Sequence, residues 1–230
     1  MNSNELKNFA KKVGADLCGI APIERFSDAP KGFSPLDVYP QTKSVIAFAK
    51  RIPKTSLYLP TSIPYTVIEY ESLSDSHGIA YNLMLYIESK GYEATVVPSE
   101  PYEYWDEENK TGKGLVSLKH VCAKCGLGIF GKNHLLYNPQ FGNLIRLGAV
   151  LTNAILEPDN ILEGDICKPG CNLCIDSCPV GAINKKGVNQ AKCRANSQRK
   201  TKKGDIIYNC TICRRVCVNV CGVKIEPEVA

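Results

Sequence analysis

Two segments of the first hundred residues have helical periodicity. Leu6 and Phe9 lie on one apolar stripe of residues 4–13, which predicts a charged, amphipathic N-terminal helix. The longest helical pattern of the chain covers residues 65–90. Gly91 follows it directly, and glycine is the residue that most often ends a helix. We therefore expect a short first helix and a long second one.

The segments around these helices have the apolar pattern of strands. Four strands are expected, three from continuous apolar runs and one from alternation: residues 16–21, 44–49, 92–97 and 144–152. A shorter helix is expected at 115–124, and the acidic, aromatic residues 99–113 are expected to form a loop. Because helices and strands alternate, the pattern predicts an α/β domain over residues 1–159.

The amino-acid composition indicates the class of protein. Of the 230 residues, 44% are hydrophobic and 22% are charged, which is typical of a globular protein. No apolar run approaches the roughly 20 residues that cross a bilayer. The N-terminal helix lacks the apolar core of an export signal. We expect a cytoplasmic protein with no membrane association.

The twelve cysteines are unevenly placed, and nine of them lie between Cys167 and Cys221. Gaps of two and three residues between cysteines in a cytoplasmic protein indicate metal binding rather than disulfides. This predicts a second, cysteine-rich domain over residues 160–230.

The spacing within this region is typical of iron–sulfur ligation. One run reads C-x3-C-x2-C-x3-C-P from Cys167, and another reads C-x2-C-x3-C from Cys210. In two-cluster ferredoxins the cysteine before proline ligates the other cluster. The rule predicts one [4Fe–4S] cluster on Cys167, Cys171, Cys174 and Cys217, and a second on Cys178, Cys193, Cys210 and Cys213. Cys221 is an alternative to Cys217, and two structural zinc sites are an alternative to the clusters.

Charge is concentrated in the same region. From Ile166 onward, twelve Lys and Arg stand against four Asp and Glu. These cations are expected to offset the negative clusters. The alternative is a nucleic-acid or acidic-partner surface, for which no aromatic residues are interleaved. Its candidate residues are Arg194, Arg199, Lys200, Lys202 and Lys203.

A glycine-rich segment precedes the cysteines and resembles a known family. Residues 125–133 read CGLGIFGKN, and residues 16–21 read DLCGIA. Together with residues 44–46, residues 70–77 (YESLSDSH) and the cysteine runs, they resemble the epoxyqueuosine reductases and the corrinoid-dependent reductive dehalogenases, as a short variant.

The resemblance implies an α+β protein with a nitroreductase-like α/β N-terminal domain that holds cobalamin, followed by a two-[4Fe–4S] ferredoxin-like domain. Electrons from a donor such as ferredoxin or flavodoxin would pass through both clusters and reduce the corrinoid. It also implies that the glycine-rich segment contacts the cofactor, through Gly126, Gly128, Gly131, Lys132 and Asn133. The alternative is that the glycines only pack a helix against a strand.

Other residues permit two interpretations each. His77 is expected to be a structural histidine, and the alternative is a cobalt ligand. Cys122 and Cys125 are either a redox dithiol, with metal ligation as a variant, or small core residues. Cys18, on an apolar strand, is expected in the core.

The family's acidic proton donor aligns with Gly112 here. Tyr104, Asp106, Glu107 and Glu108 are possible substitutes, or else they form a solvated loop. Three functions follow from the sequence. The first is an iron–sulfur oxidoreductase that reduces a corrinoid or another acceptor. The others are an electron-transfer or activator protein that serves a corrinoid protein, and a tRNA-modifying reductase. A halogenated substrate is the least favoured.

Overall fold

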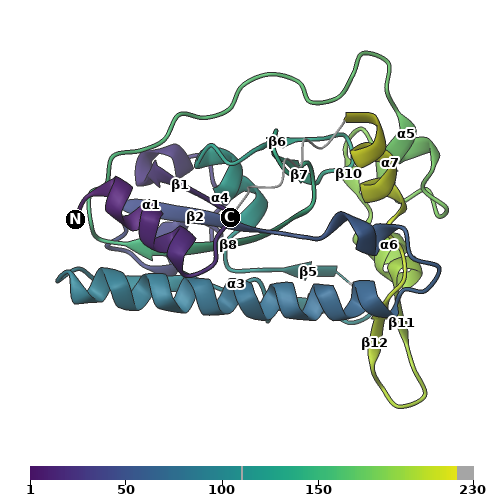
Figure 1. Ribbon diagram of the computed structural model, residues 1–230, viewed down its shortest axis with the longest axis horizontal. Coiled ribbons are helices and arrows are strands. Elements are labelled where there is room, and N and C mark those ends of the chain that lie inside the picture. The colour runs from purple at the N-terminus through teal and green to yellow at the C-terminus, as the bar shows by residue number, and fades with distance from the viewer. Residues whose placement is uncertain (110, 222–230) are drawn as a thin grey trace.

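The computed structural model describes residues 1–109 and 111–221, with the side chain of Cys221 excepted. Its helices and strands follow one another along the chain as Figure 1 shows. Their bounds are α1 (Ser3–Lys12), β1 (Leu17–Pro22), η1 (Ile23–Phe26), α2 (Pro35–Val38), β2 (Ser44–Arg51), η2 (Lys54–Leu57), α3 (Ile63–Ser89), β3 (Ala94–Val97), β4 (Tyr104–Asp106), β5 (Thr111–Lys113), α4 (Leu118–Lys124), β6 (Ile129–Phe130), β7 (Leu136–Tyr137), β8 (Ile145–Thr152), α5 (Leu173–Asp176), β9 (Ile183–Asn184), β10 (Gly187–Val188), α6 (Gln190–Ser197), β11 (Gln198–Lys200), β12 (Ile206–Tyr208) and α7 (Ile212–Cys221).

A four-stranded antiparallel sheet forms the centre of the N-terminal part, with the strand order β1-β2-β8-β3. Along β2, Val45, Ala47 and Ala49 belong to the apolar cluster of α4, while Ile46 and Phe48 belong to that of α1 and α3. This two-residue alternation is what a strand covered on both faces requires. It explains why residues 44–49 form a continuous apolar run.

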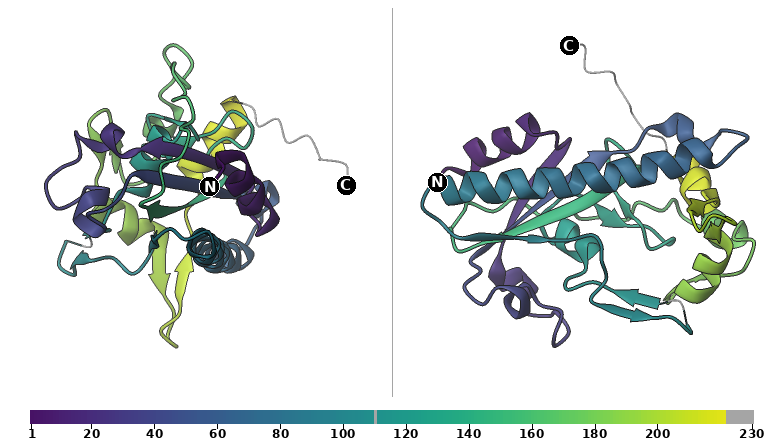
Figure 2. Two further views of the ribbon diagram at one scale, coloured as in Figure 1. Left: turned by 90° about the vertical axis from the view of Figure 1, so that its left-hand side faces the viewer. Right: turned by 90° about the horizontal axis from the view of Figure 1, so that it is seen from below.

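Helix α3 is 27 residues long and runs the length of the molecule (Figure 2). Ile79, Leu83 and Ile87 in its C-terminal half pack on the sheet. Gly91 follows with a φ of 82°, in the left-handed region that glycine adopts easily. The helix and its stop are therefore confirmed, with a start two residues earlier than predicted.

The cysteine-rich region packs on the N-terminal half of the same helix. Val218 of α7 is buried beside Ile52, Leu57 and Tyr65. Tyr208 of β12 donates its backbone N–H to the Thr66 hydroxyl, at 3.0 Å. These contacts fix the cysteines relative to the sheet.

Residues 99–113 differ from the prediction of a loop. They contain a short antiparallel hairpin of β4 and β5. Its pairs are few and its β4 side chains are all exposed. The apolar alternation that marks a strand is therefore missing from the sequence. Among the described residues, none of the helices combines the length and apolar character that a bilayer crossing requires.

Candidate metal centre

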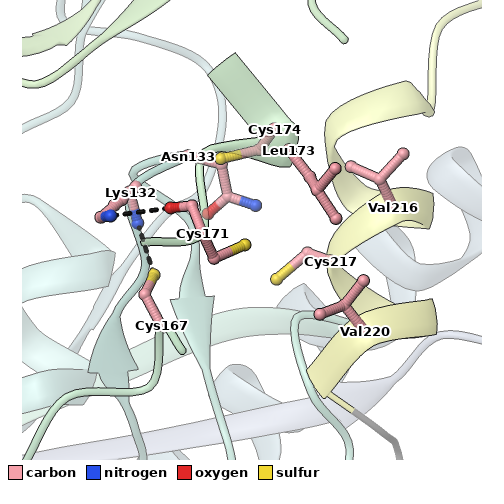
Figure 3. A pocket seen from close by; sticks show the side chains of 9 residues that line it. All are labelled: Lys132, Asn133, Cys167, Cys171, Leu173, Cys174, Val216, Cys217 and Val220. Carbon is pink, nitrogen blue, oxygen red and sulfur yellow. Dashed lines mark hydrogen bonds between the residues drawn. The ribbon is translucent and has the colours of Figure 1, made fainter. Parts of the chain in front are cut away.

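Four cysteine side chains face one small cavity between α5 and α7 (Figure 3). Cys167 and Cys171 lie in the loop before α5, Cys174 lies in α5, and Cys217 comes from α7. Apolar side chains complete the wall, namely Leu173, Val216 and Val220. The structure thus brings together the first of the two predicted ligand sets, from segments that are about forty residues apart in the sequence.

Lys132 and Asn133 line the same cavity. The backbone N–H of Lys132 donates to the Cys167 sulfur at 3.4 Å, and its ammonium donates to the Cys171 carbonyl at 2.7 Å. The Asn133 amide reaches the Cys213 carbonyl at 3.4 Å. The end of the glycine-rich segment is therefore bonded to the cysteine loops. Sequence reasoning had connected these two residues with a corrinoid, and no periodicity in the sequence points to the cysteines instead.

The second predicted set is also gathered in one region. Cys178 follows α5, Cys193 lies on α6, and Cys210 and Cys213 lie before and on α7. Burial raises the pKa of Cys193, and the charges of Cys210 and Cys178 raise it further. Burial likewise raises the pKa of Cys213 to about 11, with added repulsion from Cys193 and Cys210. These charges act between Cys193 and each of the other three thiols, so the four predicted ligands lie in one neighbourhood.

Cys178 differs from the others because its pKa is lowered. Burial acts to raise it, but backbone N–H groups that begin with that of Val180 outweigh this effect. The N–H of Ala182 reaches the sulfur at 3.2 Å. A thiolate that accepts several backbone N–H groups is stabilised as an anion. The turn after Cys178 therefore favours the thiolate form of this cysteine, which is the form that binds metals.

No three His, Cys, Asp or Glu side chains among the described residues meet closely enough to hold one metal ion. A tetrahedral zinc site needs all its sulfurs about 2.3 Å from one centre. Nor does any disulfide join the cysteines whose side chains are described. Cys167, Cys171, Cys174 and Cys217 face a common cavity, and whether they hold a cluster stays a prediction.

The three glycines of the glycine-rich segment approach parts of this chain. A Cβ on Gly126 would lie 2.2 Å from the Asn160 carbonyl oxygen, and one on Gly128 would lie 2.6 Å from that of Tyr137. Contacts this short leave no room for any side chain. The interpretation that these glycines serve internal packing accounts for them, and their contact with a corrinoid stays a prediction.

The cysteines of the N-terminal part lie in or beside its core. Cys122 and Cys125 are both 0% exposed. Burial raises the pKa of each thiol well above its ordinary value. Cys18 is partly buried on β1, and burial raises its pKa to about 12. These thiols stay protonated at neutral pH, which favours small core residues over a redox pair.

Two further sequence candidates lie on the surface. His77 is exposed on α3, so it is not a packed structural histidine. Asp106 is exposed on the β4–β5 hairpin, where backbone and side-chain N–H groups of Asn109 lower its pKa. A Cβ on Gly112 would lie 2.9 Å from the Tyr102 ring. Aromatic rings thus pack against the position at which the resemblance led us to expect an acid.

A second cavity, of about 380 Å³, is lined by Arg194 and Tyr208, which are close in sequence to Cys193 and Cys210. The Arg194 guanidinium lies 5.1 Å from the ring centre of Tyr102 and 4.7 Å from that of Trp105, within range of cation–π attraction. Other residues complete its lining: Glu100, Pro101, Gln198 and Ile206. Sequence reasoning missed this site, because the aromatic residues and the arginine come from segments that are about ninety residues apart.

Comparison with known proteins gives the chain's relatives. No protein-family model matches it. The epoxyqueuosine reductase of Bacillus cereus is 32% identical, over 96% of this chain and 66% of that protein. The epoxyqueuosine reductase of Bacillus subtilis is 26% identical, over 93% and 62%. The chain spans just under two thirds of the length of these relatives.

Solved structures share the fold. A crystal structure of an epoxyqueuosine reductase with an epoxyqueuosine-modified tRNA-Tyr stem loop has a TM-score of 0.64 at 21% identity, over 93% of this chain and 64% of that one. A catabolic reductive dehalogenase has a TM-score of 0.58 at 18% identity, over 78% and 25%. The mixed α+β architecture is therefore that of the epoxyqueuosine reductase structures.

Proposed function

The chain is a relative of the epoxyqueuosine reductases along nearly all of its length, and we propose that it is an iron–sulfur oxidoreductase with two [4Fe–4S] clusters. The observation that carries this proposal is the convergence of Cys167, Cys171, Cys174 and Cys217 on one cavity. The gathering of Cys178, Cys193, Cys210 and Cys213 supports the second cluster. In this proposal residues 1–159 form the α/β domain and residues 160–230 the two-cluster domain.

The clusters, when bound, supply one-electron transfer. The chain's own residues hold them and set their potentials through hydrogen bonds, burial and local charge. Lys132 places a backbone N–H on Cys167 and an ammonium beside the first cavity. The N–H groups after Cys178 do the same at the second set. Each donor stabilises the more negative, reduced state. The two sets lie near each other, since the charge of Cys174, in the first set, acts on Cys213 in the second.

The 380 Å³ cavity is the proposed place of the electron acceptor. Arg194, which follows the ligand Cys193 directly, and Tyr208, two residues before Cys210, both line it. An acceptor there would lie beside the second cluster. Cavities of this volume hold drug-sized ligands. A complete cobalamin is larger, and the stacked Arg194 side chain takes up part of the space. The described cavity therefore does not enclose a whole corrinoid, which favours another acceptor or a corrinoid on a partner protein.

The test is anaerobic purification followed by iron and sulfide counts and a titration with cob(II)alamin under EPR. We expect about eight irons per chain, four for each cluster. A stoichiometric change of the cobalt signal would establish a bound corrinoid and justify assays with epoxyqueuosine. Eight irons with an unchanged cobalt signal would leave a two-cluster electron-transfer protein. A protein without sulfide would contradict the proposal itself.

A second candidate function is action on tRNA, and one observation favours it. The hairpin β11–β12 projects from the molecule in Figure 1 and carries four exposed cations, namely Arg199, Lys200, Lys202 and Lys203. The cavity at its base presents Tyr102 and Trp105, which are 36% and 45% exposed. The fold thus supplies the aromatic faces that the basic sequence lacks. Cations for phosphates beside aromatic faces for bases are the elements of single-stranded RNA binding.

Salt dependence separates this candidate from a basic surface that receives an acidic ferredoxin or flavodoxin. If the hairpin binds tRNA, replacing Lys202 with Gln should reduce the slope of log affinity against log salt by about 1. Trp105→Ala should weaken binding with little change of slope. Lys12→Gln, on the distant α1, is the matched control. Loss of reduction by the protein donor, with no RNA binding at low salt, would instead assign the surface to the donor.

A further inference from the structure

Arg214 of α7 turns its guanidinium into the protein next to a proposed cluster ligand. It follows Cys213 directly, and the Cys213 charge acts on it. Its Nη1 donates to the Asn143 carbonyl, and the Asn143 amide donates back to the Arg214 carbonyl at 3.4 Å. Asn143 is 2% exposed. The arginine is therefore held in place by the loop before β8 rather than free in solvent.

One carboxylate lies near two arginines: it is paired with Arg146, and the charge of Arg214 also acts on it. Glu69 of α3 forms an ion pair with Arg146, which also donates to the Ser72 hydroxyl at 3.2 Å. The side chains of Glu69 and Arg146 are only 11% and 23% exposed. Burial acts to raise the pKa of Glu69, but the charges of Arg146 and Arg214 outweigh it and the pKa is lowered. The carboxylate is thus ionised, and it faces two cations.

Arg146, Arg214 and Glu69 together carry one net positive charge, because Glu69 supplies one negative charge against two positive ones. Tyr65, the other acidic group beside Arg214, does not compensate, because burial raises its pKa and keeps it a neutral phenol. Arg214 is half-buried, and an uncompensated charge with limited access to water is costly, so proteins normally pair it. The remaining negative group beside Arg214 is the Cys213 thiolate, which exists when the second cluster is bound.

We propose that Arg214 is the counter-cation of the second cluster and raises its reduction potential. The negative charge of Glu69 limits this rise. The inference rests on the proposed function, since it requires the cluster. Four thiolates outweigh the charge of the iron–sulfide core, so the cluster is an anion, and the electron that it takes from the donor makes it more negative. A fixed cation in a partly dehydrated site stabilises that state. No bond forms or breaks, and Arg214 keeps its protons throughout.

Substitutions of Arg214 and Glu69 are expected to shift the midpoint potential of the second cluster in opposite directions. Arg214→Gln removes the cation, so the midpoint potential of the second cluster should become more negative. Glu69→Gln removes the anion and keeps an acceptor for Arg146, so the potential should become less negative. A general loosening of the fold would not produce opposite shifts. Arg25→Gln is the matched control, because Arg25 is an arginine bonded to a backbone carbonyl, that of Lys124, away from the clusters.

The measurement is an EPR-monitored redox titration of the full chain, after iron and sulfide have been counted. Cys193→Ser identifies which signal belongs to the second cluster. If Arg214→Gln does not fold, Arg214→Lys, which keeps the charge and should keep the potential near wild type, is compared with Glu69→Gln. Wild-type clusters whose potentials move in neither Arg214→Gln nor Glu69→Gln would overturn the inference alone. Absence of clusters from the wild type would overturn the proposed function.

Discussion

Cysteines of this chain differ in what surrounds their sulfur atoms. The Cys122 and Cys125 thiols donate toward the carbonyls of Phe48 and Val45, at 4.0 and 3.5 Å, inside the core. Cys174 instead faces the cavity of Figure 3, where burial raises its pKa and the charges of Cys167 and Cys171 raise it further. The core keeps Cys122 and Cys125 as protonated thiols. In the cavity, a bound cation is needed before Cys174 loses its proton.

A pair of substitutions distinguishes these environments. Cys174→Ala should remove one cluster and lower the iron content by about four per chain, because a cube with three protein ligands is poorly retained. Cys122→Ala should keep all the iron and cost roughly 1 kcal/mol of stability for the cavity it leaves. Iron analysis and thermal unfolding measure the two effects. Equal iron loss in both variants would contradict the division between core and ligand cysteines.

Lys132 allows a second prediction at this scale. Lys132→Met removes the ammonium bonded to the Cys171 carbonyl and the Asn172 side chain. The first cluster should then become harder to reduce, by on the order of 60 mV, which corresponds to about 1.4 kcal/mol for one electron. Lys119→Met is the control, because the Lys119 ammonium is also bonded to a carbonyl, that of His134, but does not line the cavity. A redox titration in which both variants behave alike would contradict this role.

At the scale of elements, the sequence predicts helices and strands better than their pairing. Residues 44–49 and 65–90 could be assigned because burial on one or two faces leaves an apolar period. The antiparallel order β1-β2-β8-β3 could not, since it joins β2 to a strand about a hundred residues later. The β4–β5 hairpin was missed for another reason, because its β4 side chains are exposed and leave no apolar alternation in the sequence. The Trp105 ring of β4 lies against Arg194, whose sequence position gives no hint of the contact.

Two glycine-to-alanine substitutions test whether the glycine-rich segment serves internal packing. Gly128→Ala should destabilise the protein by roughly 1–3 kcal/mol, because the added Cβ would clash with the Tyr137 carbonyl of β7. Gly78→Ala should instead stabilise it by up to about 1 kcal/mol, since Gly78 lies within α3 and its Cβ would meet nothing within 4 Å. Denaturant unfolding gives both values. If Gly128→Ala is neutral, the glycine is kept for something other than packing.

Across the whole molecule, apolar burial and cysteine ligation stabilise different parts. The sheet and its covering helices contain the two large apolar clusters. After residue 160 the described buried apolar side chains are few, namely Cys174, Ala182, Ile183, Ile207 and Val218. A region with so small a core depends on something other than hydrophobic burial for its stability. Cluster ligation is the candidate, because metal binding free energy becomes folding free energy where a site forms only in the folded state.

This division predicts the result of removing iron. A chelator under reducing conditions should abolish amide protection in α5, α6 and α7, while β2 and β8 keep theirs, since these strands lie inside the apolar clusters. Hydrogen exchange read by mass spectrometry resolves the two regions in one sample. The Thr66–Tyr208 contact joins them, so the N-terminal half of α3 should lose part of its protection too. Uniform loss over the chain would mean that the clusters support the whole fold. Unchanged protection near α7 would mean that the cysteine region folds without its metal.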